Sequence, residues 1–304
     1  MKVRVKAYII LILCAGCAGP EVKPSIEGTS SQEKVGISDA ATKERMTKLF
    51  DEGLRIMDDN PKGALALFNE ILMVVPDRWE IYYNSGLSYL RLNEYEKAEE
   101  RFKKALKNNA PPVKAYNAIG SVYLASGNMI KAVETIKKSL DIEESQTAMI
   151  NIAGAYQALG QNDMAVKYYR KAGLADPSNR VIHNNLGVLL YNMGNYKGAL
   201  EEFNKALDKK GDDDARLLMY EAQSVLKTGD YEGAVNTFKR MLAVVPDNPS
   251  PFLNMGIIYE IYLMDMEKAV ENFEAYIKKG GPKAKEVEAW LEIARNKGKS
   301  KEGG

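Results

Sequence analysis

Cysteine and histidine are almost missing from this chain of 304 residues. The two cysteines, Cys14 and Cys17, lie close to the N-terminus, and the single histidine is His183. Zinc sites built from Cys and His, and catalysis by a cysteine nucleophile, are therefore excluded for the rest of the chain. The sequence also lacks a phosphate-binding glycine loop, an HExxH pattern and a serine nucleophile elbow. We expect no enzymatic activity, no catalytic residue, no metal and no cofactor.

A dominant charge of either sign is missing as well. The chain has 42 Lys and Arg against 41 Asp and Glu, a formal net charge of +1. No run of basic residues follows one face, so the sequence predicts no nucleic-acid partner. With 45% hydrophobic and 27% charged residues, the composition is typical of a globular protein rather than a disordered or fibrous one.

The N-terminus has the features of an export signal. Lys2, Arg4 and Lys6 precede a short apolar stretch, residues 7–15, which is too short to cross a bilayer as a helix. A basic start, a short apolar core and small residues at its end predict a secretory signal peptide. An ordinary cleaved signal with incidental cysteines is the alternative to the lipoprotein interpretation that follows.

The end of this signal, Ala15-Gly16-Cys17, resembles the lipobox of bacterial lipoproteins. It departs from that pattern at Cys14, where the family usually has Leu. The resemblance implies a signal peptide over residues 1–16, lipidation of Cys17, and an outer-membrane anchor with the protein facing the periplasm. Residues 17–41 are rich in Pro, Gly, Ser and charge, which predicts a flexible tether.

The body of the chain repeats with a period close to 34 residues. Its marker alanines are separated by 34, 34, 33, 34, 35 and 35 residues, and they are Ala64, Ala98, Ala132, Ala165, Ala199, Ala234 and Ala269. Four residues after each comes a large side chain: Phe68, Phe102, Ile136, Tyr169, Phe203, Phe238 and Phe273. A tiny residue lies upstream of each alanine: Gly53, Gly86, Gly120, Ala153, Gly187, Ala222 and Gly256. We call these the alanine, large and small columns.

This order of columns resembles the tetratricopeptide repeat, TPR. The resemblance implies an all-α fold, a right-handed superhelical solenoid with seven helical hairpins over residues 42–281. Small side chains allow the two helices of a hairpin to cross closely. The turns inside the hairpins carry residues that tolerate left-handed backbone, Asp59, Asn93, Gly127, Gly160, Gly194 and Gly229. Apolar residues at helical spacing predict a capping helix over 282–297, and we expect a disordered tail over 298–304.

A candidate binding groove lies on the first helix of each hairpin. The column two residues before the small column reads Asp51, Asn84, Ala118, Asn151, Asn185, Tyr220 and Asn254. A ladder of side-chain amides can pair with the backbone of an extended peptide. We therefore predict protein or peptide partners in a concave groove formed by Asn84, Asn151, Asn185, Asn254, Tyr83, Asn117, Tyr191 and Gln223. The alternative is that these Asn residues are structural. Lys114 and Arg91 do not form the matched set of a carboxylate-clamp TPR.

Two further features have simple structural interpretations. His183 occupies a packing column shared with Tyr82, Tyr116 and Phe252. Residues 211–214 lack the ligand spacing of a calcium-binding loop and predict a turn between repeats.

The complete chain resembles TPR lipoproteins that help secretin pores assemble for type IV pili, and also those that organise cell-wall hydrolases. The resemblance implies a lipid-anchored scaffold in a bacterial envelope assembly. The alternatives are an adaptor that organises cell-wall enzymes and a TPR adaptor without an anchor. No residue selects between them.

Overall fold

The computed structural model describes residues 40–207 and 214–302, and within them it contains fifteen helices and no strand. Signal peptide, lipobox cysteine and nearly all of the predicted tether lie outside the described residues. The helices are α1 (Ala40–Ile56), α2 (Pro61–Val74), α3 (Trp79–Arg91), α4 (Tyr95–Lys107), α5 (Pro112–Ala125), α6 (Met129–Leu140), α7 (Gln146–Ala158), α8 (Asn162–Ala175), α9 (Arg180–Asn192), α10 (Tyr196–Ala206), α11 (Ala215–Lys227), α12 (Tyr231–Val244), α13 (Pro249–Ile261), α14 (Met266–Lys278) and α15 (Ala284–Glu302).

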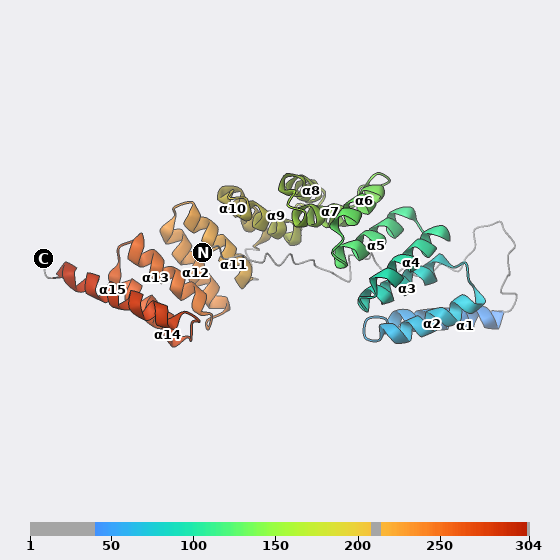
Figure 1. The fold of residues 1–304 in the computed structure, drawn as a ribbon, viewed down its shortest axis with the longest axis horizontal. Coiled ribbons are helices and arrows are strands. Elements are labelled where there is room, and N and C mark those ends of the chain that lie inside the picture. The colour runs from blue at the N-terminus through green and yellow to red at the C-terminus, as the bar shows by residue number, and fades with distance from the viewer. Residues whose placement is uncertain (1–39, 208–213, 303–304) are drawn as a thin grey trace. The chain divides into compact units, whose positions relative to one another are not determined.

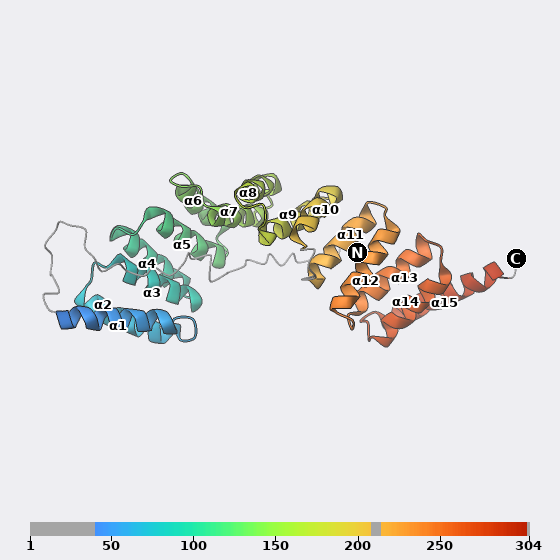
Figure 2. The ribbon, with the colours of Figure 1, turned by 180° about the vertical axis from the view of Figure 1, so that it is seen from behind.

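The chain divides into two compact units, one ending at Ala172 and the other beginning at Gly173. Each is built from helical hairpins (Figure 1), whose first and second helices we call A and B helices. The N-terminal unit contains the pairs α1–α2, α3–α4 and α5–α6, followed by α7 and most of α8. The C-terminal unit contains α9–α10, α11–α12 and α13–α14, with α15 packed on α14, and the same pairs are seen from behind in Figure 2. The seven predicted hairpins are confirmed.

The B helices begin where polar side chains cap them. In five of the seven, an Asn or Asp before the first turn accepts a hydrogen bond from a backbone N–H three residues on, which satisfies one of the donors left unpaired at a helix start. These capping residues are Asn60, Asn128, Asn195, Asp230 and Asp265.

The three sequence columns meet in the core of every hairpin. All seven marker alanines have no exposed surface. Five of the small-column residues are glycines, and a Cβ on Gly187 would lie 2.5 Å from the Phe203 ring. A Cβ built on each of the other four glycines would lie 2.5–2.7 Å from the large-column side chain of its own hairpin. A tiny residue is therefore required where the A helix crosses the B helix, as the spacing predicted.

The turn inside most hairpins contains one residue with left-handed backbone. Gly127 (φ 78°) and Asn93 (φ 59°) are examples, and the predicted turn glycines of the next three hairpins have the same conformation. Asp59 does not, so this prediction is wrong for the first hairpin. That turn is one residue shorter, and it closes through a hydrogen bond of 2.7 Å from the Asn60 N–H to the Ile56 carbonyl.

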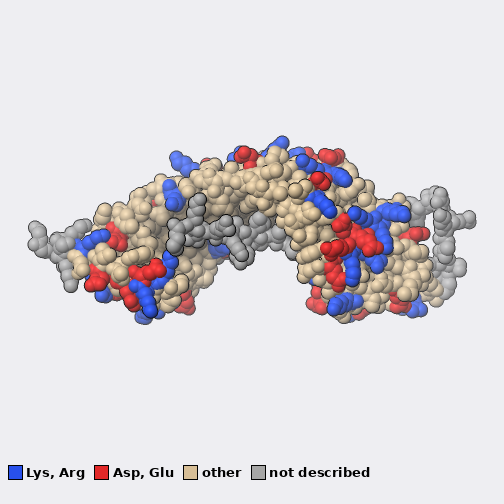
Figure 3. Space-filling model, viewed as in Figure 1, with Lys and Arg blue, Asp and Glu red and all other residues tan. Residues whose placement is uncertain are grey.

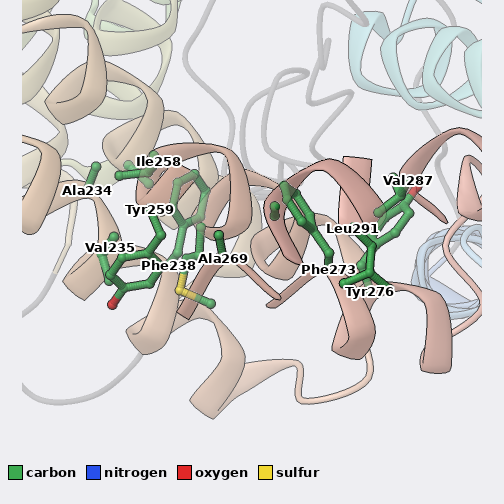
Figure 4. Packing of buried hydrophobic residues seen from close by; sticks show 13 residues of the cluster. Ala234, Val235, Phe238, Ile258, Tyr259, Ala269, Phe273, Tyr276, Val287 and Leu291 are labelled. Atoms are coloured by element: carbon green, nitrogen blue, oxygen red, sulfur yellow. The ribbon is translucent and has the colours of Figure 1, made fainter. Parts of the chain in front are cut away.

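Helix α15 covers the end of the last hairpin. Val287 and Leu291 pack beside Phe273 and Tyr276 of α14 (Figure 4). The opposite face is charged and exposed at residues 288, 292 and 295. Burial of its apolar face at the end of the last hairpin is what a capping helix provides.

Both ends of the array differ from the predicted boundaries. Helix α1 begins at Ala40, two residues before the predicted start. Helix α15 continues to Glu302, so the expected disorder over residues 298–302 is wrong. Lys297 is paired with Glu260 of α13 at 2.8 Å, which holds the last part of α15 against the preceding hairpin. Residues 303–304 lie outside the described part of the chain.

Candidate peptide-binding face

The predicted binding residues lie on the A helices of both units, and we call this surface the A-helix face. Tyr83 and Asn84 are on α3, Asn117 on α5 and Asn151 on α7. The four in the C-terminal unit are Asn185, Tyr191, Gln223 and Asn254, on α9, α11 and α13. The A-helix face therefore consists of two sets of residues, one in each unit.

Asn84 is the most buried of the ladder residues, with no exposed surface. Its Nδ2 donates to the Glu80 carbonyl at 2.8 Å, one turn earlier in α3. Its Oδ1 has no hydrogen-bond partner within the described protein. Because a backbone carbonyl can only accept, the amide orientation is fixed, and Oδ1 is the buried acceptor that remains unpaired.

The same orientation recurs at Asn254, whose Nδ2 donates to the Ser250 carbonyl at 2.8 Å. Asn117 lies one position before the ladder column, and its Oδ1 is also buried without a partner in the described protein. Asn151 is buried, and Asn185 is half-buried. Asn84 and Asn254 therefore each donate one amide N–H to a carbonyl of their own helix.

Tyr83 lies in the core rather than on the surface, with 1% of its area exposed. Its ring packs edge-on against Phe102 of α4 at 5.3 Å between centroids. The Lys114 Nζ lies 5.3 Å from the ring centroid. Burial raises the pKa of the Tyr83 hydroxyl and lowers the pKa of the Lys114 ammonium. Little of Tyr83 is available to a ligand in this arrangement.

Tyr191 and Gln223 are the two predicted residues that contact each other directly. The Tyr191 hydroxyl donates to Gln223 Oε1 at 3.1 Å, joining α9 to α11. The Tyr191 ring also packs edge-on against Tyr196 and Tyr220, each at 5.5 Å. Burial, followed by the neighbouring Tyr196 and Tyr220 hydroxyls, raises the pKa of Tyr191. The result is a half-buried aromatic cluster with one side-chain amide.

Sequence reasoning missed two members of these sets. Tyr196 begins a B helix, and its contact with Tyr191 is visible only in the folded hairpin. Ser85 follows Asn84, and its Oγ is a third buried polar atom without a partner in the described protein. The same column is apolar in four other hairpins, at Ile119, Ile152, Leu186 and Met255, and this contrast was the available signal.

The basic residues near the A-helix face are held by other groups. Arg91 forms an ion pair with Asp58 of the preceding turn, and Arg78 pairs with Glu80 at 3.2 Å. On the face seen in Figure 3, blue basic and red acidic side chains lie among one another on both units. In this view the charged side chains do not form a field of one sign.

His183 and the turn at residue 214 have structural contacts. His183 is 6% exposed and packs in the core of the C-terminal unit. Asp214 caps α11, where its Oδ1 accepts from the backbone N–H of Arg216 at 2.8 Å. The rest of the 211–214 stretch lies outside the described residues. Among the described side chains, no group of three or more His, Cys, Asp or Glu is placed to hold a metal ion.

The tetratricopeptide repeat model matches residues 59–111, 83–146, 150–215 and 185–249, which together make up more than half of the chain. The chain belongs to the tetratricopeptide repeat family. Repeats of this family fold as the helical hairpins described above, and proteins built from them generally serve as scaffolds. No helix within residues 40–207 and 214–302 is long and apolar enough to cross a membrane.

Curated relatives of this TPR chain are diverse. It is 26% identical over 201 residues to the BBSome complex member BBS4 of Bos taurus, covering 65% of this chain and 31% of that protein. It is 30% identical over 176 residues to the CTR9 homologue of Arabidopsis thaliana, covering 55% and 16%. The TPR protein MJ1428 of Methanocaldococcus jannaschii is 25% identical over 210 residues, covering 66% and 35%. The matches span about a third of these relatives or less.

Two solved structures share the fold. The C-terminal part of a TPR protein from Cytophaga hutchinsonii has a TM-score of 0.58 and 18% identity, covering 65% of this chain and 78% of that chain. PilF of Pseudomonas aeruginosa also has a TM-score of 0.58, with 16% identity, covering 71% and 96%. At these identities the similarity is one of fold alone.

Proposed function

We propose that this chain is a protein-binding scaffold, without catalytic activity, in which the A-helix face of each unit holds an extended segment of a partner protein. The observation that carries the proposal is the pair of buried amide oxygens, Asn84 Oδ1 and Asn117 Oδ1, that lack a partner in the described protein. Leaving a buried acceptor unpaired costs about 1–3 kcal/mol. Because Asn84 has no exposed surface, a partner's donor reaches its oxygen only when the side chains that cover it move aside. A donor that does so recovers part of this cost, which favours binding.

The orientation of the amides restricts what the partner presents. One N–H of Asn84 and one of Asn254 bond their own helices, so in our proposal the amide oxygens accept hydrogen bonds from the partner. Backbone N–H groups of an extended peptide repeat at regular spacing and meet this requirement without any particular sequence. In the C-terminal unit, the Tyr191 cluster adds aromatic surface with an amide beside it, which suits peptide side chains.

Peptide display on the purified chain tests this proposal. A peptide selected on the wild-type protein is measured against the double variant Asn84→Ala, Asn117→Ala. We expect binding to weaken about tenfold or more, because two acceptors are removed. Asn272→Ala is the matched control, since its Nδ2 makes the same 2.8 Å bond to the preceding turn of its helix, but the residue is half-buried on a B helix, α14. Equal affinity for the wild type and the double variant would show that the ladder does not bind the peptide.

The finer part of the proposal places this scaffold in a bacterial envelope, anchored by lipid at Cys17 and facing the periplasm. Its support is the basic start, short apolar core and Ala-Gly-Cys ending of the first residues. A role in pilus or secretin assembly rests on the resemblance of signal, tether and repeats to TPR lipoproteins of that kind. Stable anchoring needs more than one acyl chain, which a lipidated N-terminal cysteine carries.

Palmitate labelling tests the anchor. Cys17→Ala is expected to abolish labelling and move the protein out of the membrane fraction, whereas Cys14→Ala is expected to leave both unchanged. Labelling that persists in Cys17→Ala refutes the anchor. Crosslinked capture of the anchored protein then separates the two envelope roles: a secretin or pilus protein supports assembly of a pore, and cell-wall hydrolases support the alternative adaptor role.

A further inference from the structure

The single histidine of the chain contacts two hydrogen-bond acceptors at once. His183 Nδ1 lies 2.6 Å from Glu202 Oε2 on α10. His183 Nε2 lies 2.9 Å from the Pro177 carbonyl, in the turn between α8 and α9. The side chain is 6% exposed, so water does not readily replace either partner. All three residues lie in the C-terminal unit.

Both contacts require a proton on the ring nitrogen. A backbone carbonyl has no hydrogen to give, so Nε2 must donate to Pro177. An ionised carboxylate likewise only accepts, so Nδ1 must donate to Glu202. A neutral imidazole carries one N–H, and either tautomer would place a ring lone pair against an oxygen lone pair.

Glu202 is held in its ionised form by its neighbours. Burial works against its charge, but hydrogen bonds from Lys205 and His183 outweigh burial and lower the pKa of the Glu202 carboxyl. Lys205 Nζ bonds the second oxygen, Oε1, at 2.8 Å. The carboxyl group therefore cannot readily supply the proton that a neutral imidazole would lack.

Other charged groups near the histidine bond elsewhere. On α9, the Arg180 Nε donates to the Ala206 carbonyl at 2.8 Å. In the turn, Asp176 Oδ1 accepts from Ser178 Oγ at 2.7 Å and from its backbone N–H. From α8, Gly173 approaches the imidazole with no side chain. Glu202 is therefore the acidic group bonded to the ring, with Lys205 as its second cation.

We propose that His183 is a proton-operated clip, whose doubly protonated ring fastens the 176–179 turn to helix α10 and whose loss of one proton frees the turn. At acidic pH the ring donates a hydrogen bond to both the Pro177 carbonyl and the Glu202 carboxylate. As the pH rises and the ring becomes neutral, one contact is lost. The neutral ring keeps its proton on Nδ1, because the ionised Glu202 is a stronger acceptor than a backbone carbonyl. Nε2 then faces the Pro177 carbonyl with a lone pair, and the turn before α9 loosens.

Because His183 is the chain's one histidine, its ring nitrogens can be observed directly by ¹⁵N–¹H NMR of the full chain. We expect two N–H groups at acidic pH, one after titration, and a fall in hydrogen-exchange protection of the Ser178 and Asn179 amides over the same pH interval. The fall, corrected for intrinsic exchange, is expected to be on the order of tenfold, since one charge-assisted bond is lost.

Two variants distinguish the clip from simple packing. His183→Met places at this position a side chain that the same column already has at Met149, which is buried. This variant should make the hydrogen-exchange protection of the turn independent of pH. Glu202→Gln can donate to a neutral ring, so Nε2 keeps its proton for Pro177 and the pH dependence should disappear while protection remains. Wild-type protection that does not change as the ring titrates, or a single N–H throughout, would overturn the clip. Neither readout depends on peptide binding, so the proposed function is tested separately.

Discussion

The Phe203 ring lies so close to Gly187 that a Cβ there would meet it at 2.5 Å. Gly187→Ala must therefore displace the Phe203 ring, which has no exposed surface. We expect the C-terminal unit to lose about 1–3 kcal/mol of unfolding free energy, the usual cost of overpacking. Urea unfolding followed by tyrosine fluorescence measures it.

Gly173→Ala is the control for this variant. It also adds a methyl group to a helix, but the new Cβ would lie 3.6 Å from the nearest Ile182 atom, an ordinary contact. Here the better helix propensity of Ala should dominate and raise stability by up to about 1 kcal/mol. If both variants change stability in the same direction, the close crossing at Gly187 is not what restricts that position.

Glu221 and Arg240 form an ion pair in which one partner is much more buried than the other. We therefore expect replacement of Arg240 and replacement of Glu221 to cost different amounts of unfolding free energy. Glu221 is 7% exposed, while Arg240 keeps about half of its side chain in solvent. Arg240→Met leaves a buried carboxylate without its cation and should cost about 1–3 kcal/mol. Glu221→Met leaves an arginine that can turn to water and should cost less. A double-mutant cycle by thermal unfolding checks the order, and equal costs would contradict it.

Acid should weaken the contact between α4 and α5 through Glu99. Burial opposes its charge, but hydrogen bonds from Lys103 and Tyr123 prevail and lower the pKa of this carboxyl below 4.5. The Tyr123 hydroxyl donates to Glu99 Oε1 at 2.7 Å. A lowered pKa means that the stabilisation is present above pH 4.5 and is lost as the pH falls through the folded-state value.

Tyr123 contributes to stability with the opposite pH dependence, which appears at alkaline pH. Burial, followed by the bond to Glu99, raises the pKa of Tyr123 from 10.0 to about 12. This contribution is present below pH 10 and is lost as the pH rises through about 12.

Glu99→Gln should flatten the acid limb of the stability profile. Glu100→Gln removes a comparable pair with Lys104 on the exposed side of α4, and it should change the acid limb less because no second helix is joined.

We expect the charged pair Glu52–Arg55 at the start of the repeat array to prevent self-association of the protein. Arg55 is exposed and paired with Glu52 at 2.7 Å. The residues in the same column of the later A helices have at most 1% exposure, and they are Ser88, Val122, Ala155, Leu189, Ser224 and Ile258. Replacing Glu52 and Arg55 by Leu should create an apolar end that promotes association.

Light scattering after size-exclusion chromatography measures the mass of this variant. Replacing Glu100 and Lys104 by Leu is the matched control, since that exposed pair on a B helix has no equivalent among the stacked positions. We expect a concentration-dependent mass for the first variant only. An unchanged mass for both would show that the charged end does not limit association.

The sequence by itself determined the repeat architecture. Ala199, Gly187 and Phe203 recur with their equivalents at a fixed spacing, because each hairpin must repeat the same close crossing to stack on the next. The capping helix was also predictable, since Val287 and Leu291 lie at helical spacing among polar residues. These features depend on local periodicity, which is visible in a linear chain.

Only the tertiary structure decided what the singled-out side chains touch. Tyr83 and Tyr191 were predicted alike, yet one is buried against α4 and the other is half-buried beside Gln223 of α11. Asn84 was predicted to offer donors and acceptors, but one of its N–H groups bonds its own helix and its buried oxygen is left unpaired. His183 was predicted to pack, and its two acceptors come from a turn and a helix that the fold brings to it. Such contacts depend on how one helix lies against another, and spacing along the chain carries no information about that geometry.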